Sequence, residues 1–367
     1  MPVGNSDRGV GLGAGEIMLF SDLSYQKFDW WHAEIPDAYQ PGTNLAEEFE
    51  HEGLFINKSI NLGLTIGLSD YWNVTLSQIL IDRCMEWEGP VWASEDVGFN
   101  SDIHNVGDSK TVHHRSECAS TDFIDMNGNV NAFGGYLGDT KINFKYLLLN
   151  QGKGPGSRMF IGAGLTIPKK YTLTDSPWST TIYDHDNNPN TPNIETFSPH
   201  RHFYLSDGAY KISTEIQFFK KRIKKPVFWG GTFSLTAPIN KSDYGYKPST
   251  RYELSLMALS GPIKNIETNI LMLSSIGLNF TAAYTSPSEW DNKRTPNSEA
   301  VMYIPGISFL FTTNNSEIGT FGLNFQRGYE KYMQNSERDI EETNKIYSIS
   351  ISYRKLLDKY IDKLYWK

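Results

Sequence analysis

The chain has 367 residues, of which 39% are hydrophobic and 13% aromatic, and its formal net charge at pH 7 is −8. This acidic balance argues against nucleic-acid binding, which depends on Lys and Arg contacts to phosphate. No stretch approaches the roughly 18 consecutive apolar residues that a membrane-spanning helix needs. Helical insertion is therefore excluded, whereas β-insertion stays open because a barrel strand needs apolar residues only at alternate positions.

The N-terminal residues, Met1 to Arg8, lack the apolar region of a signal peptide. Taken literally, this beginning would indicate a cytoplasmic protein. We expect instead that the reading frame is truncated or that the signal has been removed, since the rest of the chain predicts an exported protein.

Hydrophobic residues then recur with a period of two. In the segment 60–68, Ile60, Leu62, Leu64, Ile66 and Leu68 alternate with Asn61, Gly63, Thr65 and Gly67. The pattern resumes after Asp70, where Trp72, Val74 and Leu76 alternate with polar residues. A helix, with 3.6 residues per turn, would mix the two sets, so the pattern predicts a β-hairpin.

The same pattern continues to the end of the chain, where Tyr347, Ile349 and Ile351 alternate with serines. It predicts strands near residues 14–30, 54–68, 72–84, 137–149, 157–168, 202–219, 227–238, 250–261, 270–285, 301–313, 319–328 and 345–355. These are twelve strands, an even number.

The predicted connections alternate between long and short. The long ones are 31–53, 85–136, 169–201, 239–249, 286–300 and 329–344, and the short ones centre on Asp70, Gly154, Lys224, Lys264 and Asn315. Outer-membrane barrels have this asymmetry, with short periplasmic turns and long extracellular loops. The sequence therefore predicts an all-β fold, a transmembrane antiparallel up-and-down β-barrel of about twelve strands. A soluble β-sandwich or lectin-like domain is the alternative.

This topology divides the chain into three parts. We expect an N-terminal periplasmic segment over residues 1–13, the β-barrel over residues 14–355 and a C-terminal tail over residues 356–367. Aromatic residues that flank strands, namely Tyr71, Trp72, Trp229 and Tyr284, suit the interfacial belts of such a barrel.

The lumen is the expected functional surface, because the polar face of each strand encloses water. The alternation directs eight ionisable residues inward: Asp139, Lys141, Lys145, Lys211, Glu215, Arg251, Glu253 and Arg354. Mixed charges inside a pore set its selectivity. The alternative is that they form salt bridges that only stabilise the barrel.

The chain has two cysteines, Cys84 and Cys118, and both fall near one long polar connection. In an oxidising compartment they could pair, and two free thiols are the alternative. Neither a disulfide framework nor a Cys-rich zinc site is possible with two cysteines.

Two loop segments contain residue types that can bind metal ions. Asp184, Asp186, Asn188 and Glu195 have the spacing of a calcium loop, but Pro189 stands where that loop needs a glycine. His113, His114 and Cys118, with His104 upstream, could bind a transition metal. A plain solvated loop is the expectation for both, and we expect no metal and no cofactor.

Three stretches, residues 137–146, 202–210 and 230–238, resemble the outer-membrane transporter-like barrels named after a phenol-degradation (meta-cleavage) pathway. These barrels are distant relatives of the long-chain fatty-acid channels. The resemblance covers most of residues 55–355. It implies a barrel that passes small, often hydrophobic, molecules, and it transfers no catalytic residue.

Together these observations predict a porin-like passive pore for small molecules in the outer membrane of a Gram-negative bacterium, and not an enzyme. Its expected partners are outer-membrane lipid and a small-molecule solute. Two alternatives stay open: a non-conducting barrel whose external loops bind a partner, and an outer-membrane hydrolase. For a hydrolase the nearest cluster is His200, Arg201 and His202, but it lacks a neighbouring serine in the right place, since Ser206 is four residues on. The solute, the oligomeric state and whether the lumen is plugged are left open.

Overall fold

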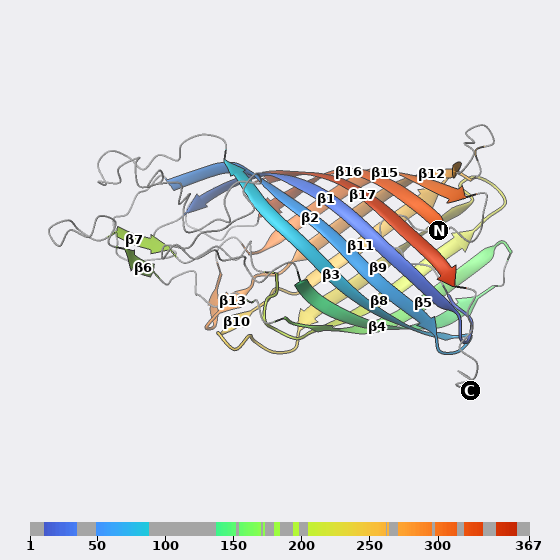
Figure 1. The fold of residues 1–367 in the computed structure, drawn as a ribbon, viewed down its shortest axis with the longest axis horizontal. Coiled ribbons are helices and arrows are strands. Elements are labelled where there is room, and N and C mark those ends of the chain that lie inside the picture. The colour runs from blue at the N-terminus through green and yellow to red at the C-terminus, as the bar shows by residue number, and fades with distance from the viewer. Residues whose placement is uncertain are drawn as a thin grey trace.

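A computed structural model describes most of the predicted strands. The described residues are 11–34, 49–87, 137–151, 154–169, 172, 180–183, 194–197, 205–261, 263, 271–295, 298–313, 319–332 and 343–357. Twelve long strands close into an antiparallel barrel in which β1 pairs with both β2 and β17 (Figure 1). The predicted fold class is confirmed.

The barrel strands follow one another around the wall in chain order. They are β1 (Ile17–Glu34), β2 (Phe49–Gly67), β3 (Trp72–Trp87), β4 (Leu137–Asn150), β5 (Gly156–Ile167), β8 (Lys211–Lys221), β9 (Phe228–Pro238), β11 (Arg251–Leu259), β12 (Leu271–Thr285), β15 (Ala300–Thr313), β16 (Thr320–Tyr332) and β17 (Thr343–Leu357). Among the residues that the structure describes, none forms a helix long and apolar enough to cross a membrane.

Five short strands were not predicted. β6 (Thr180–Tyr183) pairs with β7 (Ile194–Phe197), and β10 (Tyr246–Lys247), β13 (Glu289–Trp290) and β14 (Lys293–Arg294) form a three-stranded sheet. Both small sheets lie at the end of the barrel opposite the one where β1 begins and β17 ends (Figure 1). They lie within the long connections, where two-residue and four-residue strands leave too little alternation to detect.

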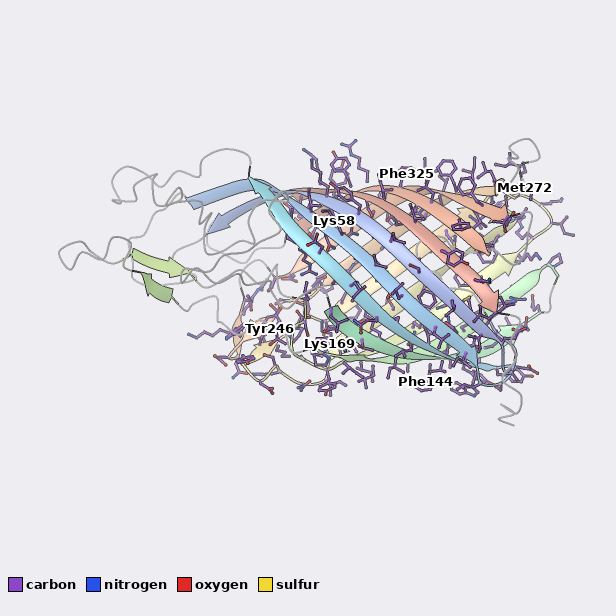
Figure 2. All side chains as sticks on the ribbon, viewed as in Figure 1. Lys58, Phe144, Lys169, Tyr246, Met272 and Phe325 are labelled. Atoms are coloured by element: carbon purple, nitrogen blue, oxygen red, sulfur yellow. The ribbon has the colours of Figure 1, made fainter. Side chains whose placement is uncertain are left out.

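Exposure shows which face of each strand points outward. In β17, Ile349 and Ile351 are 45% and 47% exposed, whereas Ser348 and Ser352 are 4% and 5% exposed. Phe144 and Phe325 likewise project outward from opposite sides of the barrel (Figure 2). A soluble sandwich would bury these apolar rows between two sheets, so their exposure places them where a membrane barrel meets lipid.

Aromatic side chains gather near both ends of the outer surface. At the short-turn end, Tyr146 lies against Tyr71 and Trp72, with ring centroids 6.1 and 4.9 Å away. Toward the other end, the rings of Tyr252 and Tyr284 lie 6.0 Å apart. Amphipathic rings at these two levels are typical of the interfacial belts of membrane proteins.

One predicted strand began too early. The prediction placed it at residues 202–219, but β8 begins at Lys211. Ser206 Oγ accepts a hydrogen bond from the Gly208 backbone N–H, and Gly208 has a φ of 70°. This turn chemistry breaks the strand, since a positive φ favours glycine and cannot continue a β-ladder.

The cysteine pairing stays a prediction. Cys84 belongs to β3 by its backbone, but its side chain and the whole of Cys118 lie outside the described residues.

Candidate functional site in the barrel lumen

The interior of the barrel contains a cavity of about 260 Å³. Its lining comes from β1, β17, β16, β15, β12, β11, β9 and β8, which are consecutive in the wall. Because strand partners share a face, the inward residues of one strand identify those of the next. Asn279, for example, is the register partner of Gly306, which is the partner of Gln326, which is the partner of Ser348.

One side of the lumen is uncharged, and we call it the neutral wall. It consists of the inward-facing residues Asn279 of β12, Ser308 of β15, Asn324 and Gln326 of β16, and Ser348 and Ser350 of β17. Two described ionisable residues face inward from these four strands, Glu330 and Arg354, and no other does. Glu330 lies near the end of β16 and Arg354 near the end of β17, at opposite ends of the barrel.

Hydrogen bonds connect the neutral wall across three strands. Asn279 Nδ2 donates to Ser308 Oγ at 2.6 Å and to Asn324 Oδ1 at 2.7 Å. Gln326 Nε2 donates to Asn279 Oδ1 at 3.0 Å. Gly306 makes room for this arrangement, because a Cβ there would collide with Asn279 Oδ1 and Gln326 Cγ. The amides therefore lie along the wall and leave the cavity beside them.

The facing side of the lumen carries ionisable groups, and we call it the charged wall. It consists of Arg83 of β3, Asp139 and Lys141 of β4, Lys211 and Glu215 of β8, and Arg251 and Glu253 of β11. Several of these are paired: Arg251 Nη2 lies 3.3 Å from Glu253 Oε2, and Asn143 Nδ2 donates to Glu215 Oε1 at 3.3 Å. Lys211 donates a hydrogen bond to Asp207.

Lys141 differs from the other cations of the charged wall. Its side chain is exposed and forms no hydrogen bond or ion pair with any described residue. Its charge nevertheless interacts with those of Lys211, Asp139, Glu253 and Arg251, which come from three strands. A side chain that is accessible to water yet surrounded by charges from other strands lies in the lumen and not on the outer surface.

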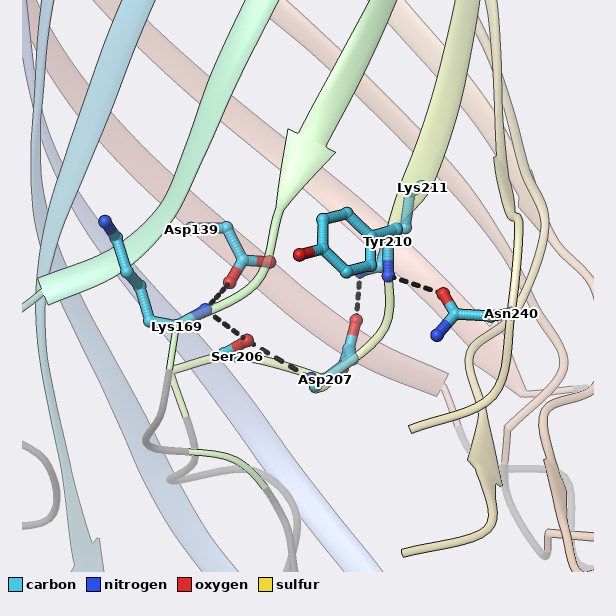
Figure 3. Close-up of polar contacts among 8 residues, drawn as sticks. Asp139, Lys169, Ser206, Asp207, Tyr210, Lys211 and Asn240 are labelled. Atoms are coloured by element: carbon cyan, nitrogen blue, oxygen red, sulfur yellow. Dashed lines mark hydrogen bonds and ion pairs between the residues drawn. The ribbon is translucent and has the colours of Figure 1, made fainter. Parts of the chain in front are cut away.

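The charged wall is braced at the end of the barrel that carries the long connections (Figure 3). The Lys169 backbone N–H donates to Asp139 Oδ1 at 3.3 Å and to Ser206 Oγ at 3.2 Å. The Tyr210 backbone N–H donates to Asn240 Oδ1 at 2.9 Å. Ser206 Oγ thus accepts hydrogen bonds from the backbone of Lys169 and Gly208. His200 and His202 of the hydrolase hypothesis lie outside the described residues.

The other end of the lumen is packed with apolar side chains. Met18, Phe20, Phe160 and Phe219 face inward and are at most 5% exposed. Lys145 is 2% exposed and its Nζ lies 5.8 Å from the centre of the Phe160 ring. An ammonium over an aromatic face is stabilised by the ring quadrupole, which explains how this lysine can be buried.

Residues 11–16 cross this apolar end of the barrel. The Gly15 backbone N–H donates to Gly67 O at 2.8 Å and the Gly67 N–H to Glu16 O at 2.9 Å. Leu12 packs with Met18 and Phe20. On the far side, a Cβ at Gly11 would lie 3.3 Å from the Phe160 ring of β5. The segment therefore spans from β2 to β5 and helps to fill the lumen.

The eight ionisable residues of the sequence prediction fall into two groups in the structure. Asp139, Lys141, Lys211, Glu215, Arg251 and Glu253 belong to the charged wall, whereas Lys145 and Arg354 are buried, at 2% and 7% exposure. Their role in selectivity stays a prediction. Sequence reasoning passed over the neutral wall, although its residues alternate with apolar ones in the same strands, because it searched for charge.

The metal-site hypotheses fall mostly outside the described residues. Asp184, Asp186, Asn188, His113 and His114 are not described. In the part of the chain that the structure covers, no group of three His, Cys, Asp or Glu residues could hold a metal ion.

A closed barrel with an apolar outer surface and a polar interior defines the class of outer-membrane β-barrels. Among solved structures, the chain is similar to the COG4313 outer membrane channel from Pseudomonas putida F1, with 11% identity and a TM-score of 0.52 over 97% of this chain and 100% of that chain. This likeness shows a shared fold.

Two further structures are more remote. The Pseudomonas putida toluene transporter TodX has 10% identity and a TM-score of 0.38, over 93% of this chain and 89% of that chain. A Pseudomonas aeruginosa FadL homologue has 9% identity and a TM-score of 0.39, over 95% of this chain and 96% of that chain. At these scores neither carries an argument about function. No protein-family model matches the chain, and no curated protein matches it.

Proposed function

We propose that this protein is a passive, non-enzymatic channel for small solutes in the outer membrane. The observation that carries the proposal is the lumen cavity of about 260 Å³, bounded by inward-facing side chains of consecutive strands. A barrel that served only as a scaffold for its loops would gain stability by filling this space, since packed interiors leave few voids larger than a water molecule.

The lining of the cavity indicates what kind of solute fits. Amide and hydroxyl groups of the neutral wall offer hydrogen bonds, and Met257, Met302 and Ile304 offer an apolar surface beside them. A small amphipathic solute, with both polar groups and an apolar part, satisfies both kinds of lining. A purely hydrophobic solute would displace water from Asn and Ser side chains without replacing its hydrogen bonds, which is unfavourable.

Passage requires a change at the short-turn end. Met18, Phe20, Phe160 and Phe219 close the lumen there, together with residues 11–16. The β-strands are fixed by their ladders, whereas residues 11–16 are held by a few hydrogen bonds and by Leu12. We therefore propose that this segment is the part that moves when a solute passes toward the periplasm.

The channel proposal is tested by conductance in planar bilayers and by liposome swelling. Ser350→Trp places a large ring in the cavity, whereas Ile351→Trp places the same ring on the lipid-facing side of the same strand. We expect the parent and Ile351→Trp to conduct equally and Ser350→Trp to conduct less. Folding of each variant is checked by heat-modifiable migration on a gel.

A correctly folded parent protein that never conducts, and that admits no small solute into liposomes, would overturn the proposal. It would leave the non-conducting barrel with partner-binding loops as the better explanation.

A further inference from the structure

The hairpin between β8 and β9 carries an unusual concentration of positive charge. Its sequence from residue 220 to 225 is Lys-Lys-Arg-Ile-Lys-Lys, and all six residues are exposed. The turn is ordered by its backbone, since the Arg222 N–H donates to Val227 O at 2.7 Å and the Val227 N–H donates to Leu259 O at 2.9 Å. No described residue forms an ion pair with any of the five basic side chains.

A groove opens on the outer surface over the two strands that this basic turn connects, β8 and β9, and over β11 and β12. It has a volume of about 630 Å³. Two outward-facing positions in the groove carry small residues, Gly231 and Ala258. The Leu256 side chain lies over Gly231, where an added Cβ would be 2.7 Å from Leu256 Cδ2. Larger outward-facing side chains form its rim: Ile216, Phe218, Trp229, Phe233, Leu254, Leu256, Leu278 and Phe280.

The register of β8 and β9 shows that a basic residue and residues of the groove lie on the same face of the sheet. Lys220 is the partner of Trp229, and Phe218 is the partner of Gly231, so all four lie on the outer face. Lys220 and Phe218 are two residues apart on one strand, which separates them by about 7 Å. Lys220 therefore lies beside Trp229, which lines the groove at the level where an interfacial aromatic residue is expected.

Charge decides which occupant fits. In a membrane, acyl chains cover any apolar outer surface, but only an anionic headgroup is attracted by five cations that form no ion pair with the described residues. The basic turn lies at the end that carries the short turns, where β1 begins and β17 ends (Figure 1), which in outer-membrane barrels is the periplasmic end. The lipid within reach is thus one of the periplasmic leaflet.

We propose that the basic turn and the adjoining groove together bind an anionic glycerophospholipid, with its phosphate on Lys220, Arg222 and Lys224 and one acyl chain in the groove over Ala258. The inference depends on the membrane placement of the barrel and not on its conductance. An acidic soluble partner of the turn alone is the competing possibility, and it would need no groove.

Three variants of the full-length protein in neutral detergent test the proposal by native mass spectrometry. Lys220→Gln/Arg222→Gln/Lys224→Gln removes charge from the turn, and Ala258→Trp fills the groove without changing charge. Arg327→Gln/Lys331→Gln/Lys345→Gln is the matched control, because it removes three outward-facing cations near the opposite end. The probes are phosphatidylglycerol, phosphatidylcholine with the same chains, and soluble glycerol 3-phosphate.

We expect the parent and the control to prefer phosphatidylglycerol over phosphatidylcholine, and the turn variant to bind phosphatidylglycerol at least about tenfold more weakly. Ala258→Trp should weaken both lipids. Raising the salt concentration should reduce the preference of the parent protein, because screening weakens exposed charges. This measurement keeps the proposal testable if a variant does not fold. Conductance should be the same in every variant, so the channel proposal stands or falls separately.

Three outcomes would overturn the inference. The parent protein could bind both lipids equally, the turn variant could retain full preference for phosphatidylglycerol, or glycerol 3-phosphate could compete as strongly as the intact lipid. The last result would mean that the turn is a general anion site in which the groove has no part.

Discussion

The two walls of the lumen are built from the same kind of strand, yet they hold their polar groups in different ways. On the neutral wall, Asn279, Asn324 and Gln326 satisfy one another across neighbouring strands. On the charged wall, Arg251 pairs with Glu253 and Lys211 with Asp207, and Lys141 remains exposed without a partner among the described residues.

This difference separates stability from selectivity. A network of neutral amides contributes about 1 kcal/mol per hydrogen bond and exerts little long-range force on an ion. A charge acts across the lumen, and at about 5 Å in a water-like medium it changes the energy of a monovalent ion by about 0.8 kcal/mol. The neutral wall should therefore matter for folding, and Lys141 for the choice of ion.

The largest expected effect concerns the apolar end of the lumen. While residues 11–16 close this end, few ions pass, and a difference in selectivity between the two walls cannot be measured. Leu12→Asp places a carboxylate beside Met18 and Phe20. Burying an isolated charge costs several kcal/mol, more than the few hydrogen bonds of residues 11–16 provide. We expect the segment to leave its site and single-channel conductance to rise, with Leu12→Met as a control that conducts like the parent. Equal conductance of Leu12→Asp and the parent would show that residues 11–16 do not close the lumen.

The second effect tests the neutral wall. Asn324→Leu removes the acceptor of Asn279 Nδ2 and of Ser308 Oγ, and it leaves both groups inside the wall. Asn279 Nδ2 keeps its hydrogen bond to Ser308 Oγ, so two hydrogen bonds are lost. At about 1 kcal/mol for each hydrogen bond, we expect the free energy of unfolding to fall by about 2 kcal/mol. The measurement is urea unfolding in detergent, and the ion selectivity of the folded fraction should not change. A selectivity change as large as that of a charge substitution would break the distinction between the walls.

The features that can be predicted from the sequence are those that the membrane imposes on each strand separately. The strand positions and the closed barrel are predictable because lipid imposes an apolar residue at every second position, as in Tyr347, Ile349 and Ile351. The side of each residue follows from its position in the alternation, which predicts that Lys141 and Glu253 face inward from β4 and β11.

Three features could not be predicted, because they depend on which strands meet. Asn279 and Asn324 are 45 residues apart, and only closure of the barrel brings their amides to 2.7 Å. The alternation alone does not distinguish Lys141 in open lumen from Lys145 beneath residues 11–16. The outer groove next to Trp229 requires Gly231 and Ala258 to be neighbours across two strands.

The third effect tests the charged wall directly. Lys141→Glu changes the local charge by two units, which at about 0.8 kcal/mol each amounts to about 1.6 kcal/mol for a monovalent ion. The change has opposite signs for cations and anions, so the ratio of anion to cation permeability shifts by about 3.2 kcal/mol, or roughly two-hundredfold. Reversal potentials in a salt gradient measure this ratio, and they should shift toward cation preference. Lys141→Gln should produce roughly half the shift in energy. An unchanged reversal potential would mean that ions do not pass beside β4.

The smallest effect is expected from the same charge reversal on the other face of the sheet. Arg327 lies on the outer side of β16, where its guanidinium stands 5.4 Å from the centre of the Tyr347 ring. Arg327→Glu should lower stability by less than about 1 kcal/mol, the value of an exposed cation–π contact. It should leave the reversal potential unchanged, because the barrel wall separates residue 327 from the conducting path. If Arg327→Glu shifted selectivity as much as Lys141→Glu, position relative to the wall would not govern ion choice, and net charge of the whole barrel would be the better explanation.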